Sequence, residues 1–301
     1  MNLSTSPSKD PGDRPSALAG GPTVLRMMLG AQLRKLREDR NISAEQAGYT
    51  IRASHSKISR METGRVGFKE RDVADLLTLY GVADPDERAA MLELVSRANE
   101  PGWWHNYNDL LPNWFEIYMG LEGAASLIRT YELQFVPGLL QTEGYARALI
   151  PLGFPEITDD ELDRRVQLRM RRQSRLHAGD LRVWAIVDEN ALRRPIGGKS
   201  VMREQVEHLI ELSTRQNVTI QVLPFNAGGH AGVSGAFSLL RFPEETLPDI
   251  AYLEQLTSAL YLDKPADIDR YLQVMNRLAL EAAQPEESRD MLTRVLTNRT
   301  A

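Results

Sequence analysis

The residues best suited to chemistry in this chain lie in one short segment, Ser-His-Ser-Lys-Ile-Ser-Arg-Met-Glu at positions 54–62. Ser56, Ser59 and Arg60 are three or four residues apart, so in a helix they share one face. An arginine fork can donate two hydrogen bonds to guanine, and hydroxyl groups suit several bases. The segment therefore predicts a helix that reads base edges in the major groove of DNA.

Four side chains are the predicted base readers: His55, Ser56, Ser59 and Arg60. Three are the predicted phosphate contacts, close to the free N–H groups of the helix N-terminus: Ser54, Lys57 and Arg52. Arg60 has an alternative use, because an ion pair with Glu62 or Glu45 would occupy its guanidinium. His55 has one as well, because it could be an ordinary solvated side chain.

A helix-turn-helix would position these side chains. Ser43 and Gln46 have the spacing of a capping box, and Ser54 can cap the helix that follows. Small residues at 47 and 48 let two helices approach closely, and three apolar side chains can close the wedge between them: Ile51, Ile58 and Met61. Apolar periodicity predicts flanking helices at 25–41, at 73–80 and from residue 85 onward.

The dipeptide Pro101-Gly102 interrupts the helical pattern and marks the predicted domain boundary. We expect a disordered tail at 1–24, an all-α helix-turn-helix domain at 25–100, a larger domain at 101–290 and a C-terminal tail at 291–301. Helices are predicted in the larger domain near 116–131, 142–150, 159–177, 199–216 and 265–283. Strands are predicted at 181–187, 218–223, 236–242, 250–253 and 259–262. This order favours an α+β domain with a mixed sheet over a regular βαβ repeat.

The net charge of −5 conceals an asymmetry. Between Arg26 and Arg65 there are nine Lys/Arg and four Asp/Glu, whereas residues 66–301 carry a net −10. A basic module on an acidic body is typical of a small nucleic-acid contact surface, although such an excess can also arise by chance. The chain has no cysteine, and its five histidines lack metal-ligand spacing, so we expect no metal and no cofactor. No apolar run is long enough to cross a membrane, and we expect a cytoplasmic protein.

Several residues in the first domain match a known pattern: Leu33, Leu36, Arg37, Ser43, Glu45, the run Ser56-Lys-Ile-Ser-Arg-Met-Glu62, and Gly64. Residues 26–81 thereby resemble the helix-turn-helix of XRE-type, phage-repressor-like regulators. The resemblance places the base-contacting positions on His55, Ser56, Ser59 and Arg60. Ala44 stands where this family usually has Gln. Arg52 stands where the turn often has Gly, at a cost of ~1–2 kcal/mol if the residue must be left-handed.

The second domain carries a longer set of matching segments: Trp103-Trp104, Leu121-Glu122, Val136-Pro-Gly-Leu-Leu-Gln-Thr142 with Tyr145-Ala146, Arg169 with Arg172-Gln173, Asp188-Glu189 with Leu192-Arg193, and Leu223-Pro-Phe225 with Gly228. Residues 103–290 thereby resemble an actinobacterial domain of unknown function that follows XRE-type domains in antitoxin-like transcriptional regulators. The resemblance implies, as partner, a small companion protein that is encoded nearby. Its predicted anchors are four aromatic side chains, for which core packing at the domain junction is the alternative: Trp103, Trp104, Trp114 and Phe115.

Three other features of the larger domain have a structural alternative that we favour. Asp188-Glu189 could be an acid-base pair, but acidic residues at a helix start are more often caps. Gly228-Gly229-His230 could hold an anion, but a turn after a strand fits as well. The six arginines between 164 and 175 could contact nucleic acid or an acidic partner, or could pair with nearby acidic residues such as Asp160, Glu161 and Asp163.

These observations favour a DNA-binding transcriptional regulator. We expect a homodimer, because one short helix reads only a few base pairs. One alternative is an interaction protein that uses the helix-turn-helix as a docking module. A second is an enzyme built on residues 103–290, and we expect none, because the sequence shows no nucleophile-base or metal constellation.

Overall fold

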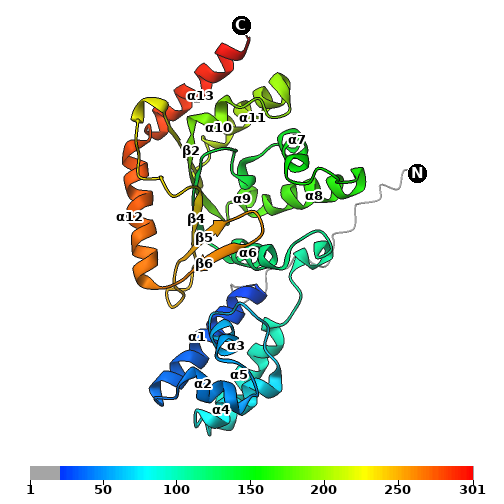
Figure 1. The fold of residues 1–301 in the computed structure, drawn as a ribbon, viewed down its shortest axis with the longest axis vertical. Coiled ribbons are helices and arrows are strands. Elements are labelled where there is room, and N and C mark those ends of the chain that lie inside the picture. The colour runs from blue at the N-terminus through cyan, green and yellow to red at the C-terminus, as the bar shows by residue number, and fades with distance from the viewer. Residues whose placement is uncertain (1–20, 301) are drawn as a thin grey trace, which may run out of the picture.

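The computed structural model describes residues 21–300 and consists of a helical N-terminal domain followed by a larger α+β domain (Figure 1). The N-terminal part, called here the HTH domain, contains five helices: α1 (Pro22–Asp39), α2 (Ala44–Thr50), α3 (His55–Glu62), α4 (Glu70–Leu79) and α5 (Pro85–Ala98). Both the helix-turn-helix and the order of the flanking helices agree with the prediction.

Local sequence signals set the ends of α2 and α3. Ser43 and Gln46 form a reciprocal capping box at the start of α2, with hydrogen bonds of 3.2 and 2.8 Å. Ser54 caps α3 by accepting a hydrogen bond from the backbone N–H of Lys57 at 3.3 Å. The apolar faces of both helices meet in one buried core, which includes the three residues predicted for the wedge: Ile51, Ile58 and Met61.

The second part, called here the large domain, spans 103–300. Its helices are η1 (Trp103–Tyr107), α6 (Asn113–Ala124), η2 (Gly138–Leu140), α7 (Glu143–Gly153), α8 (Asp159–Arg172), α9 (Ser174–Ala178), α10 (Glu189–Arg193), α11 (Gly198–Leu212), η3 (Phe225–Ala227), α12 (Pro265–Glu281) and α13 (Pro285–Thr300). Its strands are β1 (Leu127–Glu132), β2 (Arg182–Asp188), β3 (Val218–Leu223), β4 (Phe237–Arg241), β5 (Ile250–Glu254) and β6 (Ala259–Leu262).

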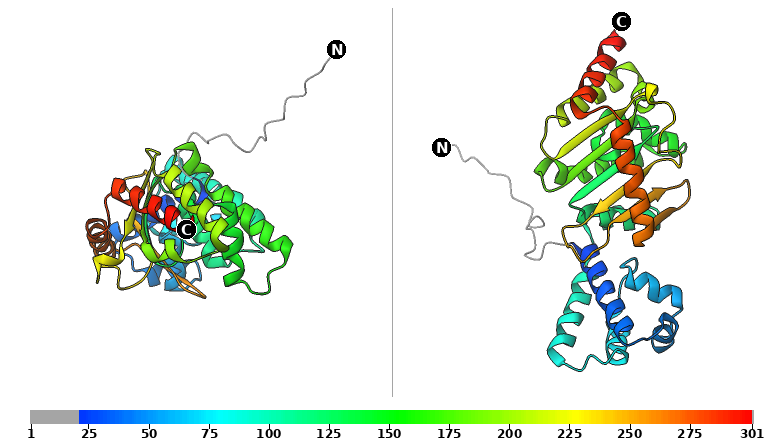
Figure 2. Two further views of the ribbon diagram at one scale, coloured as in Figure 1. Left: turned by 90° about the horizontal axis from the view of Figure 1, so that it is seen from above. Right: turned by 90° about the vertical axis from the view of Figure 1, so that its left-hand side faces the viewer.

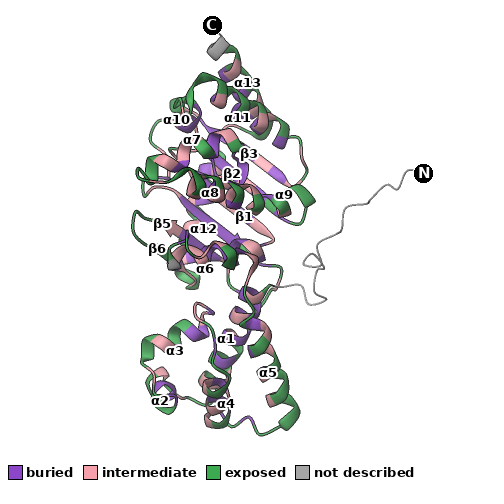
Figure 3. Cartoon of the chain, turned by 90° about the vertical axis from the view of Figure 1, so that its right-hand side faces the viewer, coloured by how far each residue is buried: buried purple, intermediate pink, exposed green. Residues whose placement is uncertain are grey.

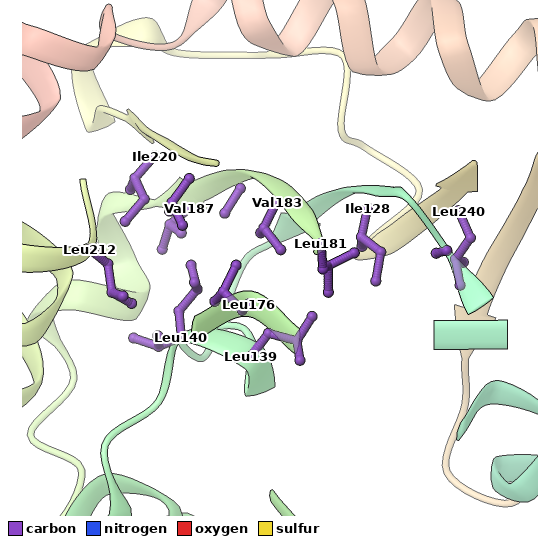
Figure 4. Packing of buried hydrophobic residues seen from close by; sticks show 14 of the residues in the cluster. Ile128, Leu139, Leu140, Leu176, Leu181, Val183, Val187, Leu212, Ile220 and Leu240 are labelled. Carbon is purple, nitrogen blue, oxygen red and sulfur yellow. The ribbon is translucent and has the colours of Figure 1, made fainter. Parts of the chain in front are cut away.

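The six strands form one mixed sheet in the order β3-β2-β1-β4-β5-β6. Strands β1, β2 and β3 are parallel, whereas β4, β5 and β6 are joined by antiparallel pairing. Helices α6, α7, α11 and α13 cover one face, and α12 covers the other (Figure 2). On the first face the side chains of Ile128 and Val183 point toward Leu139 and Leu140 of η2 (Figure 4). The predicted mixed sheet is confirmed.

Three predicted boundaries are wrong. The helix predicted near 116–131 ends at Ala124, and 127–132 form the central strand β1, whose alternating Ile128, Thr130 and Glu132 face one side of the sheet. The apolar spacing of 121–128 fits a helix as well as a strand, so periodicity alone could not separate them. The tail predicted at 291–301 instead continues α13 to Thr300, with Leu292 fully buried. Helix α1 begins at Pro22, inside the tail predicted at 1–24, whose first 20 residues lie outside the described part of the chain.

Helix α1 belongs to both domains. Val24 and Met27, in its first turns, are buried in the core of the large domain, whereas Leu29 and Leu33 are buried in the core of the HTH domain. Close packing fixes its start against α6, because a Cβ at Gly120 would lie only 2.1 Å from the Thr23 hydroxyl. One continuous helix therefore orients the helix-turn-helix relative to the sheet.

Candidate nucleic-acid interface

The outward face of α3 carries the four predicted base readers. Their side chains are exposed: His55, Ser56, Ser59 and Arg60. Exposed residues follow this outer side of α2 and α3 in Figure 3. Ile58 and Met61 anchor the opposite face of α3 in the HTH core, with 1% of each exposed. Helix α3 thus has the amphipathic form that docking in a major groove requires.

Arg60 is available for a base contact in this arrangement. Its Nε donates to the backbone oxygen of Ser56 at 3.3 Å, and it makes no ion pair with any residue described by the structure. The two carboxylates that could have occupied it have other neighbours. Glu62 is bound by Arg37 at 2.6 Å, and an oxygen of Glu45 lies 3.9 Å from the Nε2 atom of His55.

The three predicted phosphate contacts differ in their surroundings. Ser54 is exposed, although its Oγ already accepts the capping hydrogen bond of α3. Arg52 is also exposed, in the turn between α2 and α3. Lys57 is half-buried, and its ammonium lies 2.7 Å from a carboxylate oxygen of Asp72 in α4. A phosphate would therefore have to share Lys57 with Asp72.

The turn between α2 and α3 is tight and strained. Arg52 has φ +54°, the left-handed conformation in which the sequence comparison led us to expect glycine. The N–H of Ala53 donates to the oxygen of Gly48 at 2.8 Å, and a Cβ at Gly48 would approach the oxygen of Ala53 to 2.6 Å. Glycine at 48 thus permits the close approach, whereas Arg52 adopts its conformation without that freedom.

Sequence reasoning missed Tyr49 as a possible contact. This side chain lies on α2, and 88% of it is exposed. Tyrosine hydroxyl groups commonly bind DNA phosphates, and Tyr49 precedes the exposed Arg52 by only three residues. The available signal was its position: an aromatic residue on the polar side of a short helix whose buried residues are Ala47 and Gly48.

The aromatic side chains predicted as partner anchors are largely packed inside the large domain. Trp104 is buried against Leu111, Met119 and Leu168, and Trp103 and Phe115 border the same cluster. The ring of Trp103 also lies under the guanidinium of Arg171, at 4.7 Å. Trp114 is half-buried and packs against the main core of the domain. This packing agrees with the alternative interpretation, in which the four aromatic side chains belong to the core at the domain junction.

The arginines of α8 mainly bind other elements of the large domain. Arg172 donates to both oxygens of Glu122 in α6 at 2.7 Å, and Arg164 pairs with Asp109. Burial opposes the charge of Arg172, but the Glu122 carboxylate raises its pKa above the ordinary value. The partners therefore come from outside α8, not from the neighbouring acidic residues that the sequence suggested. These arginines join α8 to the rest of the domain.

Two other charged side chains of the large domain, Arg169 and Glu132, form no ion pair with the residues that the structure describes. Arg169 donates one hydrogen bond to the side-chain oxygen of Gln141 at 2.8 Å, and burial lowers its pKa to about 10. Glu132, at the end of β1, has no hydrogen bond or ion pair of its carboxylate with the described residues. Burial, together with the negative charge of Glu254, raises the pKa of Glu132 to about 8. Strongly shifted groups of this kind often mark functional sites.

The other weighed features have structural roles. Asp188 caps α10 by accepting from the N–H of Asn190 at 2.8 Å, and Glu189 accepts from Arg193 and from the N–H of Phe225. Gly228 has φ +69°, as expected for a turn. Glu189, Arg193 and Phe225 line an open groove of about 840 Å³ between α10 and α13.

Two family comparisons bear on these domains. Residues 28–91 match a family described as a helix-turn-helix domain, which covers the predicted reading helix. Residues 115–294 match a family described as a domain of unknown function (DUF5753). No curated protein and no solved structure matches the chain. No helix between residues 21 and 300 has the length and apolar character needed to cross a membrane.

Proposed function

The chain belongs to the DUF5753 family and carries a helix-turn-helix domain in front of the DUF5753 domain. We propose that the protein is a sequence-specific DNA-binding transcriptional regulator of the XRE type. One observation carries the proposal: the capped helix α3 presents His55, Ser56, Ser59 and Arg60 on one exposed face. A major groove admits such a helix, and these side chains can hydrogen-bond to base edges.

Selection of bound sequences from a random DNA library tests this function. The full chain should enrich one motif, and its affinity should fall with salt as phosphate contacts predict. Arg60→Ala should lose about 1–3 kcal/mol on the enriched site and relax preference at one base position. The matched control is Arg277→Ala in α12, whose side chain is 72% exposed and lies in the large domain. Unchanged affinity and preference in Arg60→Ala would show that the assigned reading face is wrong.

We also propose that the protein binds DNA as a homodimer, because a single helix of eight residues reads too few base pairs for adequate selectivity. Two copies on a two-fold site would place the half-sites about 10 base pairs apart. Footprinting of the enriched site, combined with the mass of the complex in solution, tests this arrangement. A single half-site bound by one copy would contradict it.

The large domain, in this proposal, is antitoxin-like and binds a partner or effector other than DNA, without catalysing a reaction. Its negative charge supports this role, because residues 103–301 carry 21 Lys/Arg and 27 Asp/Glu, a net −6, and should repel DNA at close range. Its arginines and the pair Asp188-Glu189 support it too, since they serve ion pairing and helix capping. For a companion protein, the groove that contains Phe225, 60% exposed, is more accessible than the packed tryptophans.

Co-purification with a small protein encoded beside this gene tests the partner. Phe225→Ala should abolish capture if the groove between α10 and α13 is the contact. Leu256→Ala is the matched control, because that side chain is 98% exposed elsewhere on the large domain. Capture that survives Phe225→Ala but is lost on substitution of Trp114 would restore the aromatic cluster as the anchor.

A further inference from the structure

A cavity of about 130 Å³ lies between the two domains, next to the C-terminal end of α3. Helix α1 contributes Met27 and Ala31 to it, and the segment after α3 contributes Gly64. The large domain contributes Leu121 from α6 and Ile250 from β5. Because residues of both domains form its walls, the volume of this cavity depends on how the domains are placed relative to each other.

The chemistry of the walls selects against ions. Most of the lining is apolar, and the charged groups on it have partners inside the protein. Arg34 donates to Glu38 at 2.8 Å, and Glu62 is held by Arg37. Arg65 donates to a backbone oxygen and lies 3.5 Å from Asp263. An ion would gain no unpaired opposite charge here, and apolar surfaces offer water few hydrogen bonds.

The size of the cavity suits one small ring. An engineered protein cavity of roughly 150 Å³, lined by Leu, Ile and Phe, stays free of water and takes up benzene. We propose that this interdomain cavity binds an uncharged, mainly apolar small molecule of that size, and that its occupancy strengthens DNA binding. The second half of the proposal rests on the function proposed above.

Arg65 links the cavity to the reading helix. Its backbone N–H donates to the oxygen of Arg60 at 2.8 Å, and its guanidinium donates to the oxygen of Tyr261 in β6 at 2.6 Å. The same end of α3 lies against α1, because a Cβ at Gly30 would be only 2.5 Å from the oxygen of Met61. The end of α3 therefore cannot shift without moving a wall of the cavity.

The direction of the effect follows from the conformation that contains the cavity. In this conformation the reading face of α3 is exposed, so it is competent to bind DNA. A ligand that occupies the cavity stabilises this conformation over any other arrangement of the domains. Linkage then requires that ligand and DNA each strengthen the binding of the other.

The binding site is tested with the full chain and benzene as the probe. Saturating benzene should raise Tm by about 1–3 °C, and benzoate, which adds a charge to the same ring, should not. Ala31→Leu fills the cavity and should abolish the benzene effect, whereas Ala90→Leu on exposed α5 should retain it. Leu247→Phe fills the cavity from the large domain and replaces Ala31→Leu if that variant does not fold. If benzene raises Tm equally in the cavity-filling variants and in the wild-type chain, this cavity is not the binding site.

The coupling is tested on the DNA site selected by the same protein. Benzene should tighten binding about fivefold in the wild-type chain and not in Ala31→Leu. A rise in Tm with unchanged DNA affinity overturns the regulatory half of the proposal. A chain that binds benzene but no DNA contradicts the proposed function and leaves the ligand site standing.

Discussion

The guanidinium of Arg37 donates hydrogen bonds to both carboxylate oxygens of Glu62, at 2.6 and 2.9 Å. This pair ties the last residue of α3 to α1, and only 12% of the Arg37 side chain and 7% of the Glu62 side chain are exposed. Arg37 also donates to the backbone oxygen of Ile42, just before α2. One guanidinium thus fixes both helices of the helix-turn-helix against α1.

Arg37→Met should therefore lower the free energy of unfolding by about 3–5 kcal/mol, because it leaves a buried carboxylate without a partner. Arg34→Met is the matched control, since Arg34 pairs with Glu38 on the surface and such pairs contribute about 0–1 kcal/mol. Urea unfolding measures both. Similar losses in the two variants would show that the Arg37–Glu62 pair does not hold α3 in place.

The Lys57–Asp72 ion pair predicts an unusual gain of function. Asp72→Asn removes a carboxylate 2.7 Å from the Lys57 ammonium and frees that cation for phosphate. Affinity should rise about equally for all DNA sequences, and the salt dependence should steepen by about one phosphate contact. Lys57→Ala should have the opposite effect. Titrations of one duplex at several salt concentrations measure this, and weaker binding by Asp72→Asn would exclude Lys57 as a phosphate contact.

The left-handed Arg52 predicts a trade-off between stability and binding. Arg52→Gly should stabilise the fold by about 1 kcal/mol, because glycine adopts φ +54° without strain. The same change should weaken DNA binding if Arg52 contacts phosphate. Asn41→Gly is a control at the same φ, +54°, where the gain should be smaller because asparagine tolerates this region. Thermal unfolding and DNA titration together separate the two effects.

The raised pKa of Glu132 predicts that the fold loses stability toward alkaline pH. Its pKa is about 8 in the folded protein, against 4.5 for an ordinary glutamate. Below pH 4.5 the carboxyl group is protonated in both the folded and the unfolded chain. Between pH 4.5 and 8 only the unfolded chain releases the proton, so the free energy of unfolding falls as pH rises.

Glu132→Gln should remove this fall and stabilise the fold at pH 8 by roughly 1–3 kcal/mol, with no gain near pH 4.5. Glu93→Gln, on the exposed side of α5, is the matched control and should leave the pH profile unchanged. Urea unfolding across this pH range checks the prediction. A wild-type profile in Glu132→Gln would show that the carboxylate ionises freely in the folded protein.

Capping residues and apolar spacing allowed most of the HTH domain to be predicted from sequence. Ser43, Gln46 and Ser54 act through contacts within three residues, so their roles are visible in the chain itself. The strand β1 was missed because its identity depends on pairing with β2 and β4, which lie more than 50 residues further along the chain. The sequence pattern at 121–128 does not contain that information.

The candidate functional residues also divide into those that local sequence predicts and those that depend on long-range packing. The exposed positions of α3 could be predicted, because helical geometry alone decides which side chains share a face. The occupation of Lys57 by Asp72 could not, since it depends on where α4 packs. The same holds for Arg172 and Glu122, which are 50 residues apart in sequence and meet only in the folded domain.

The shared helix α1 makes the two cores thermodynamically inseparable. A fragment that ends near Pro101 would expose Val24 and Met27 to water, and a fragment that begins there would leave their places in the larger core empty. Cutting the chain at its most obvious break in sequence would therefore damage both pieces. Heating should melt the whole protein in a single cooperative transition, in contrast to the stepwise unfolding of domains joined by a flexible linker.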